Sequence, residues 1–334
     1  LQKPVIDIGL WAMGPSEDIS RLCERYCFIV IWGAPAVFSL YGFTGWYVGM
    51  QNTRFPMFVS IFQNVINVIA SLSLVFGAHL DIEGVAFGTL IAQWSGFLVA
   101  VSFWLINYRR LWKHLKDTAG GWRGTLQAWG EFFKVNRDIF IRTVFIVAVS
   151  LSFTAIGSRQ GAVILAVNTL LMEFFTIFSY FTDGFAYAGE ALGGKYYGAK
   201  NVKAFKDLVK SFFQLGFVIM LLFTLIYAIA GKPFLSLLTS DRNVIEGTAP
   251  YFYWAVAIPF AGIAAFLLDG IFVGTMNTKG LLISSVIAAI CFFAVYFLFR
   301  NVLGNHALWL AFDTYLLVRG VVEAGIFWRL KVKD

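Results

Sequence analysis

The feature that most constrains this chain is a series of apolar stretches, each long enough to cross a lipid bilayer. Nine stretches are predicted to be membrane-spanning helices: Tyr26–Met50, Phe55–Phe76, Val85–Tyr108, Ile139–Ile156, Val163–Leu192, Leu208–Ala230, Tyr251–Val273, Leu281–Phe299 and Ala307–Trp328. Composition agrees, because 59% of the 334 residues are hydrophobic, 13% are charged and the mean hydropathy is +0.74. So little polar material cannot solvate a globule of this size, and we predict an all-α, multi-pass membrane protein.

The cysteines, the histidines and the net charge argue against several classes of function. Cys23, Cys27 and Cys291 form no CxxC pair, and the three histidines sit at span ends without a nucleophile or metal ligand nearby in sequence. We therefore expect neither an enzyme nor a metal site, and no cofactor beyond a coupling ion. The formal charge of +7 comes from Lys and Arg scattered over short loops, which argues against nucleic acid. Membrane lipids are the expected partners, and no obligate protein partner is predicted.

The loops alternate in charge, and the alternation predicts the orientation of the chain. Residues 107–137 hold seven Lys or Arg, residues 195–210 hold five, and the tail supplies Arg329, Lys331 and Lys333. By the positive-inside rule these segments are cytoplasmic, which places the C-terminus inside and the protein in the inner or plasma membrane.

Aromatic and apolar residues recur at helical spacing within the first basic segment. They are Trp122, Leu126, Trp129 and Phe133. This pattern favours an amphipathic segment lying on the membrane surface, and a plain linker with chance periodicity is the alternative.

An internal repeat organises the chain. Residues Thr44–Thr53 match Asp269–Thr278 at an offset of 225, and Pro35 matches Pro259 at an offset of 224. Both copies keep a GxxxG pattern, and the loops on equivalent sides have the same charge character. The two copies therefore share one topology, which is typical of a parallel repeat in a transporter. Pro35 and Pro259 are both expected to kink a span.

The repeat predicts two lobes. Residues 1–108 are assigned to the remainder of an N-lobe (the end of its third helix and helices four to six), residues 109–135 to a cytoplasmic amphipathic linker, and residues 136–334 to a C-lobe of helices seven to twelve. The second copy starts with two spans and part of a third that the first copy lacks, so about 90 further residues are expected upstream. The full protein is then expected to have twelve spans, with about nine present here.

One span, Val163–Leu192, carries carboxylates at bilayer depth. At 100° per residue, seven side chains fall within about 60° of one line. They are Asn168, Met172, Thr176, Ser179, Asp183, Tyr187 and Glu190. Because an ionisable group at the bilayer centre costs about 2.5–3.5 kcal/mol, this polar stripe cannot face lipid. It predicts a substrate cleft or ion path, and contacts that only hold helices together are the alternative.

Charge is concentrated in the second copy of the repeat. Asp269, Asp313, Arg319 and Glu323 stand where the first copy has Thr44, Thr89, Ser95 and Val99. Arg319 and Glu323 are i,i+4 neighbours and are expected to form a structural charge pair. Asp183 and Asp269 have no basic residue within one turn of their own helices, which makes them candidates for reversible protonation or cation binding.

These residues resemble the multidrug and toxic compound extrusion (MATE) family, and within it the DinF branch, along essentially the whole chain. The most specific parts are Leu238-Thr239-Ser240, Asp183 to Ala188 with Glu190, Tyr197-Gly198-Ala199, Leu268-Asp269-Gly270, and Asn305 to Ala311 with Leu317 to Gly320. The resemblance implies an antiporter that exports amphipathic or cationic organic compounds in exchange for protons or sodium by rocking two lobes about a central cleft. It also implies a coupling aspartate on a first helix, which is expected upstream of this chain.

Two other functions stay open. A lipid-linked oligosaccharide flippase of the same superfamily needs a cationic cleft for phosphate groups, and only Arg142 and Arg319 are basic in the interior of the predicted spans. A non-transporting membrane scaffold would explain the apolar spans, but it gives no reason for the carboxylates inside them.

Overall fold

The structure, a computed structural model, describes residues 3–4, 6–7, 17–118 and 122–329. Within those ranges the chain forms helices and turns and contains no strand, so the predicted all-α class is confirmed. Eight helical segments are long and apolar enough to cross a membrane. The chain divides into two compact units, Leu1–Gly120 and Gly121–Asp334, which are described separately below.

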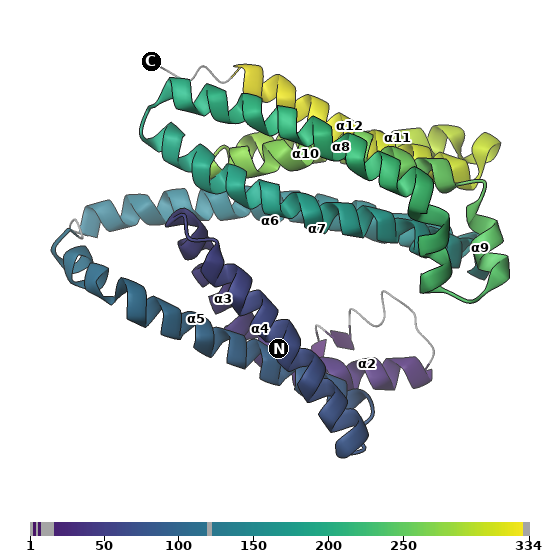
Figure 1. Ribbon diagram of the computed structural model, residues 1–334, viewed down its shortest axis with the longest axis horizontal. Helices are drawn as coiled ribbons and strands as arrows, with labels where there is room; N and C mark the ends of the chain where they lie inside the picture. The colour runs from purple at the N-terminus through teal and green to yellow at the C-terminus, as the bar shows by residue number, and fades with distance from the viewer. Residues whose placement is uncertain (1–2, 5, 8–16, 119–121, 330–334) are drawn as a thin grey trace. The chain divides into compact units, whose positions relative to one another are not determined.

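The first unit is built on a long helix, α5 (Ile82–Thr118), with α4 (Arg54–Leu72) packed along it (Figure 1). Before them, α2 (Glu17–Val30) leads into α3 (Ala34–Gly49) through a 3₁₀ turn, and α4 ends in a π turn. Pro35 lies in the first turn of α3, so it begins a new helix instead of kinking one continuous span. Proline fits there because the first turn of a helix needs no backbone N–H donor.

The described part of the second unit, residues 122–329, contains seven helices. They are α6 (Trp122–Arg159), α7 (Ala162–Gly198), α8 (Val202–Leu238), α9 (Arg242–Thr248), α10 (Phe252–Gly274), α11 (Thr278–Leu303) and α12 (Asn305–Arg329). Helix α10 contacts α7, α8 and α12, while α11 packs against α12 and α6. Figure 1 shows these long helices lying side by side within the unit. Because α10 is apolar on most of its surface, it suits this enclosed position.

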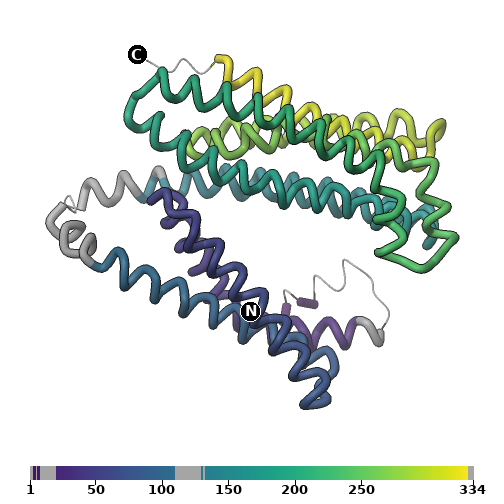
Figure 2. Tube along the Cα trace, in the orientation of Figure 1, coloured from purple at the N-terminus to yellow at the C-terminus, as the bar shows by residue number. Residues whose placement is uncertain are grey.

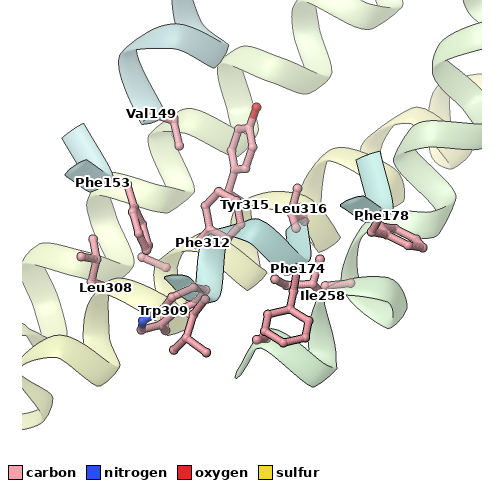
Figure 3. Packing of buried hydrophobic residues seen from close by; sticks show 14 of the residues in the cluster. Val149, Phe153, Phe174, Phe178, Ile258, Leu308, Trp309, Phe312, Tyr315 and Leu316 are labelled. Carbon is pink, nitrogen blue, oxygen red and sulfur yellow. The ribbon is translucent and has the colours of Figure 1, made fainter. Parts of the chain in front are cut away.

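Aromatic side chains fill the core of the second unit (Figure 3). Phe153 of α6 meets the indole of Trp309 on α12 edge to face, with ring centroids 5.1 Å apart. Phe174 of α7 meets Tyr227 of α8 in the same way at 4.8 Å, and the Tyr227 hydroxyl donates to the Phe174 carbonyl. Such pairs hold neighbouring helices at fixed rotations, because edge-to-face contacts are more directional than aliphatic packing.

The span count and several helix ends differ from the sequence prediction. The ninth predicted span, Ala307–Trp328, forms α12 but is not among the eight apolar segments, since it carries Asp313, Arg319 and Glu323. Helices α7 and α8 extend through most of the basic stretch 195–210, leaving only a short turn between them (Figure 2). Charged residues beyond the bilayer do not stop a helix, so hydropathy marks the span and not the helix end.

The predicted amphipathic segment is helical, but it is not a separate helix. Helix α6 begins at Trp122 and continues without interruption into the following span. Trp129 and Phe133 are 53% and 62% exposed. The side chains of Trp122 and Leu126 lie outside the described residues, as do Lys331 and Lys333. The amphipathic role and the boundaries of the linker stay predictions.

A turn of sequence Gly-x-x-Asn reverses the chain three times. The three copies are Gly49 to Asn52, Gly198 to Asn201 and Gly274 to Asn277. In each copy the third residue has a positive φ: 59° at Gln51, 54° at Lys200 and 57° at Met276. In each copy the backbone N–H of the asparagine also donates to the backbone carbonyl of the residue five positions earlier, at 2.9 Å. The first and third copies stand at the offset of 225 and share this backbone conformation, which agrees with the repeat.

Glycines let α10 approach α7 at backbone distance. A Cβ placed on Gly270 would overlap the backbone of Ala186, and one on Gly274 would overlap the carbonyl of Glu190. The GxxxG pattern of the second copy is therefore a helix contact of the kind that small residues make in membranes.

We expect Gly270→Val to destabilise the second unit strongly, because its side chain would push against the α7 backbone and not against a movable side chain. Overpacking of this kind costs about 1–3 kcal/mol or more. Thermal unfolding of the purified full-length protein in detergent measures it. Gly325→Val on α12 is the matched control, since a Cβ there meets nothing within 4 Å among the described atoms. Equal unfolding temperatures for the two variants would contradict the close α7–α10 contact.

Candidate functional site

Asp269 of α10 is the centre of a charged network inside the second unit. One of its carboxylate oxygens, Oδ2, accepts from Arg142 Nη2 of α6 at 2.7 Å and also from Arg319 Nη2 of α12. The three side chains are only 6–17% exposed. Ion pairs to Asp269 therefore join three helices at bilayer depth, where an unpaired charge would be costly.

The network continues from Arg319 to a fully buried glutamate. Arg319 Nε lies 3.6 Å from Glu323 Oε1, and that same oxygen accepts from Ser284 Oγ of α11 at 2.8 Å. The predicted Arg319–Glu323 pair therefore exists as an ion pair, but at 3.6 Å it is too long for a hydrogen bond. The short contact of Arg319 goes instead to Asp269, a residue that sequence spacing could not connect to it.

Asp183 of α7 lies at the edge of this network. It is half-buried, and the charges of Asp269 and Arg319 both act on it. The backbone contact between Ala186 and Gly270 explains this position, since it brings one turn of α7 against the turn of α10 that carries Asp269. The two aspartates that the sequence singled out are thus electrostatic neighbours.

Some buried acceptors and donors in the network have no hydrogen-bond partner among the described residues. They are Asp269 Oδ1, Glu323 Oε2, Arg142 Nε and Arg319 Nε. Buried polar groups are normally bonded, so these atoms are available for a bound ion, a proton, water or a rearranged contact.

The other polar members of the stripe in this part of α7 differ in exposure. Thr176, Ser179 and Glu190 are half-buried along α7, and Tyr187 is 48% exposed. The Thr176 hydroxyl bonds the carbonyl of Met172 one turn earlier, which satisfies it locally. Whether these residues line a cleft stays a prediction.

Asn168 belongs to a different cluster from Asp183. Its amide exchanges two hydrogen bonds with the amide of Asn305, at 2.9 and 2.8 Å, and its Oδ1 also accepts from Trp309 Nε1 at 2.9 Å. Gln160 donates to Asn305 at 3.4 Å. The expectation that Asn168 is a cleft residue does not fit this environment, because its side chain is 98% buried and its oxygen and nitrogen are both used.

Arg142 is the site residue that the sequence analysis did not assign to a site. It lies 127 residues from Asp269 in the chain, so no local pattern connects them. The available signal was that Arg142 and Arg319 are the two basic residues in the interior of the predicted spans. Since buried charges need partners, each could have been assigned to a span carboxylate, but not to a particular one.

The network is built from carboxylates and guanidinium groups. Across the described part of the chain, no group of three or more His, Cys, Asp or Glu side chains could hold a metal ion. Chemically, the arrangement offers a set of carboxylates whose negative charge is partly balanced by two guanidinium groups. A change in which carboxylate each guanidinium contacts would change the negative charge available to a cation.

Comparison with known proteins identifies relatives of this chain. The MatE family model matches residues 4–72 and 139–298. DNA damage-inducible protein F of Escherichia coli (strain K12) is 34% identical over 98% of this chain and 71% of its own length. Multidrug and toxin extrusion protein 1 of Mus musculus is 28% identical over 83% of this chain, which spans 48% of that protein. A mutant of the Vibrio cholerae MATE transporter VcmN has the same fold, with a TM-score of 0.83 at 18% identity over 97% of this chain and 74% of its own.

We expect Arg319→Met to lower the free energy of unfolding by about 3–5 kcal/mol, because it leaves Glu323 as a buried charge without its cation. The double variant Arg319→Met with Glu323→Gln should recover part of that loss, since it removes the stranded charge as well. Thermal unfolding in detergent measures both, with Arg159→Met at the exposed end of α6 as the control. If the double variant loses as much free energy of unfolding as Arg319→Met and Glu323→Gln lose together, the two residues do not interact.

Proposed function

Because the chain belongs to the MatE family, whose members are transporters and not enzymes, we propose that it works as a secondary antiporter in the cell membrane. In this proposal, small amphipathic or cationic organic compounds leave the cell while protons or sodium ions enter. Two lobes rock to expose the binding sites alternately to the two sides.

The observation that carries the proposal is the charged network around Asp269. Structural contacts between helices would be served by neutral hydrogen bonds, as the cluster around Asn168 demonstrates. The network instead retains carboxylates at bilayer depth at considerable cost. A site that takes up and releases a cation during each cycle requires such groups, because a ligand shifts an equilibrium only through different affinities for its two states.

The substrate class rests on relatives and not on the geometry. The name of the mouse relative contains "multidrug and toxin extrusion", and the resemblance to this family implies organic, often cationic, substrates. For this chain the exported compound and the coupling ion, proton or sodium, are both part of the proposal.

The second candidate, a lipid-linked oligosaccharide flippase, is disfavoured by the partners of the two span arginines. Arg142 and Arg319 are both engaged by Asp269. A phosphate group would have to displace that carboxylate before either guanidinium could bind it. No other Lys or Arg lies in the interior of the predicted spans, since Lys210 is the third residue of the span Leu208–Ala230.

The proposed orientation places the C-terminus and the three Gly-x-x-Asn turns in the cytoplasm. Each turn is followed within two residues by a cation, namely Arg54, Lys203 and Lys279. These cations support the proposed orientation, because each lies at a turn that joins two helices on the side proposed to be cytoplasmic.

We expect a cysteine at Lys200 to be protected from a membrane-impermeant thiol reagent added outside cells, and a cysteine at the exposed Asn301, at the end of α11, to react with it. The background should lack Cys23, Cys27 and Cys291. Labelling at Lys200 in intact cells, without labelling at Asn301, would reverse the proposed topology. Permeabilised cells, in which both exposed positions are open to reagent, provide the control.

We expect Asp183→Asn to insert and fold normally but to lose ion-coupled efflux, because an amide cannot change charge when a cation binds. Efflux of a lipophilic cation from vesicles containing the full-length protein is measured under separate pH and sodium gradients. Asp207→Asn, an exposed carboxylate on α8, is the matched control and should behave as wild type.

The alternative is that Asp183 only bonds a neighbouring helix. An amide can accept the same hydrogen bond, so Asp183→Asn would then keep its dependence on the gradient. That result would remove Asp183 from the coupling site and leave Asp269 as the main candidate.

A further inference from the structure

We propose that Glu323 is a positioning residue for the coupling cation: it receives Arg319 when the cation binds at Asp183 and Asp269. This inference rests on the proposed antiport function and adds a residue and a direction of movement to it. Glu323 lies on α12 and is 0% exposed.

The charges of the network do not balance. Asp183, Asp269 and Glu323 contribute three carboxylates, while Arg142 and Arg319 contribute two guanidinium groups. With all five ionised, one negative charge is uncompensated, which is expensive at bilayer depth. One monovalent cation brings the network to neutrality, and without Glu323 the two aspartates and two arginines would already be neutral. Glu323 therefore creates the demand for the cation.

The geometry prepares Arg319 to move between two acceptors. Its Nη2 donates to Asp269, whereas its Nε, 3.6 Å from Glu323 Oε1, has no hydrogen-bond partner among the described residues. Glu323 Oε2 is likewise without a partner there. Closing the 3.6 Å gap to about 2.9 Å would make a hydrogen bond from groups that are already aligned along one helix face.

A cation at the Asp183–Asp269 pair supplies the force for this movement. It offsets part of the negative charge that holds Arg319 and repels the guanidinium, which must keep a carboxylate partner because Arg319 is 95% buried. The charged groups acting on Glu323 are Asp269 from α10, Arg142 from α6 and Arg319 from its own helix, while α11 contributes Ser284. The charged residues of α11 itself, Lys279 and Arg300, lie near its two ends, and its other titratable residues are Cys291 and Tyr296. Glu323 is thus the carboxylate that remains for Arg319.

The alternative role for Glu323 is to hold α11 against α12 through Ser284 and Arg319. The two roles differ in what a neutral isostere does. A purely structural glutamate affects how much protein folds, whereas a positioning residue changes the cation concentration at which transport is half-maximal.

Glu323→Gln in the full-length protein tests the proposal. Reconstituted vesicles are assayed for efflux of a lipophilic cation as a function of pH at constant sodium, and of sodium at constant pH. We expect half-maximal efflux to need about tenfold more of the coupling cation, which is about one pH unit lower if that cation is the proton. Removal of a neighbouring negative charge weakens cation binding, so the half-maximal cation concentration should rise and not fall. Glu323→Asp keeps the charge and should stay near the wild-type value, as should Glu173→Gln on α7.

Arg142→Gln is the second variant, and it decides the outcome even where Glu323→Gln does not insert. Removing a positive charge should lower the half-maximal cation concentration, the opposite sign. An unchanged midpoint in either variant, or an equal shift in Glu323→Asp and Glu323→Gln, would overturn the inference and leave the structural role. Wild-type efflux that responds to neither gradient would instead overturn the proposed antiport function itself, so the two failures are distinguishable.

Discussion

The second unit depends on the single carboxylate of Asp269, which accepts from arginines of two other helices. Charged side chains inside a membrane are tolerated only when they face protein and find partners, so each of the three groups requires the other two. Helices α6, α10 and α12 are consequently joined at one point by interactions that are strong because water is scarce. Replacing one partner does not merely subtract a contact, since it leaves an uncompensated charge in the interior.

Close packing makes this arrangement possible. Gly270 follows Asp269 directly and brings the α10 backbone against Ala186, one turn from Asp183. A larger side chain there would separate the two helices and move the two aspartates apart. The residue that binds charge and the residue that sets helix distance are therefore neighbours in sequence, which explains why Leu268-Asp269-Gly270 stood out as a unit.

The sequence predicted most of the fold and the centre of the site, but not the connections between them. Apolar stretches located the spans, the offset of 225 matched the two segments that form the related turns at Gln51 and Met276, and the position of Asp269 opposite Thr44 drew attention to it. Sequence spacing could not show that Arg142 reaches Asp269, because α6 and α10 meet only through tertiary packing. It also assigned Asn168 to the stripe of Asp183. A helical projection shows which side chains point in the same direction but not how far apart they lie along the helix axis. Asn168 and Asp183 point in a similar direction, yet Asn168 lies beside Asn305 and Trp309.

The low hydropathy of α12 has a consequence for how the protein is made. A helix carrying Asp313, Arg319 and Glu323 gains little by entering lipid alone, because each charged residue at a helix centre opposes insertion by a few kcal/mol. Its partners Arg142, Asp269 and Ser284 all precede it in the chain and are synthesised earlier. During translation α12 can therefore leave the insertion machinery against a surface of α6, α10 and α11 that already presents complementary charge. Chain order in this unit is thus also an order of assembly, in which the charged helix α12 is inserted after the helices that provide its ion-pair and hydrogen-bond partners.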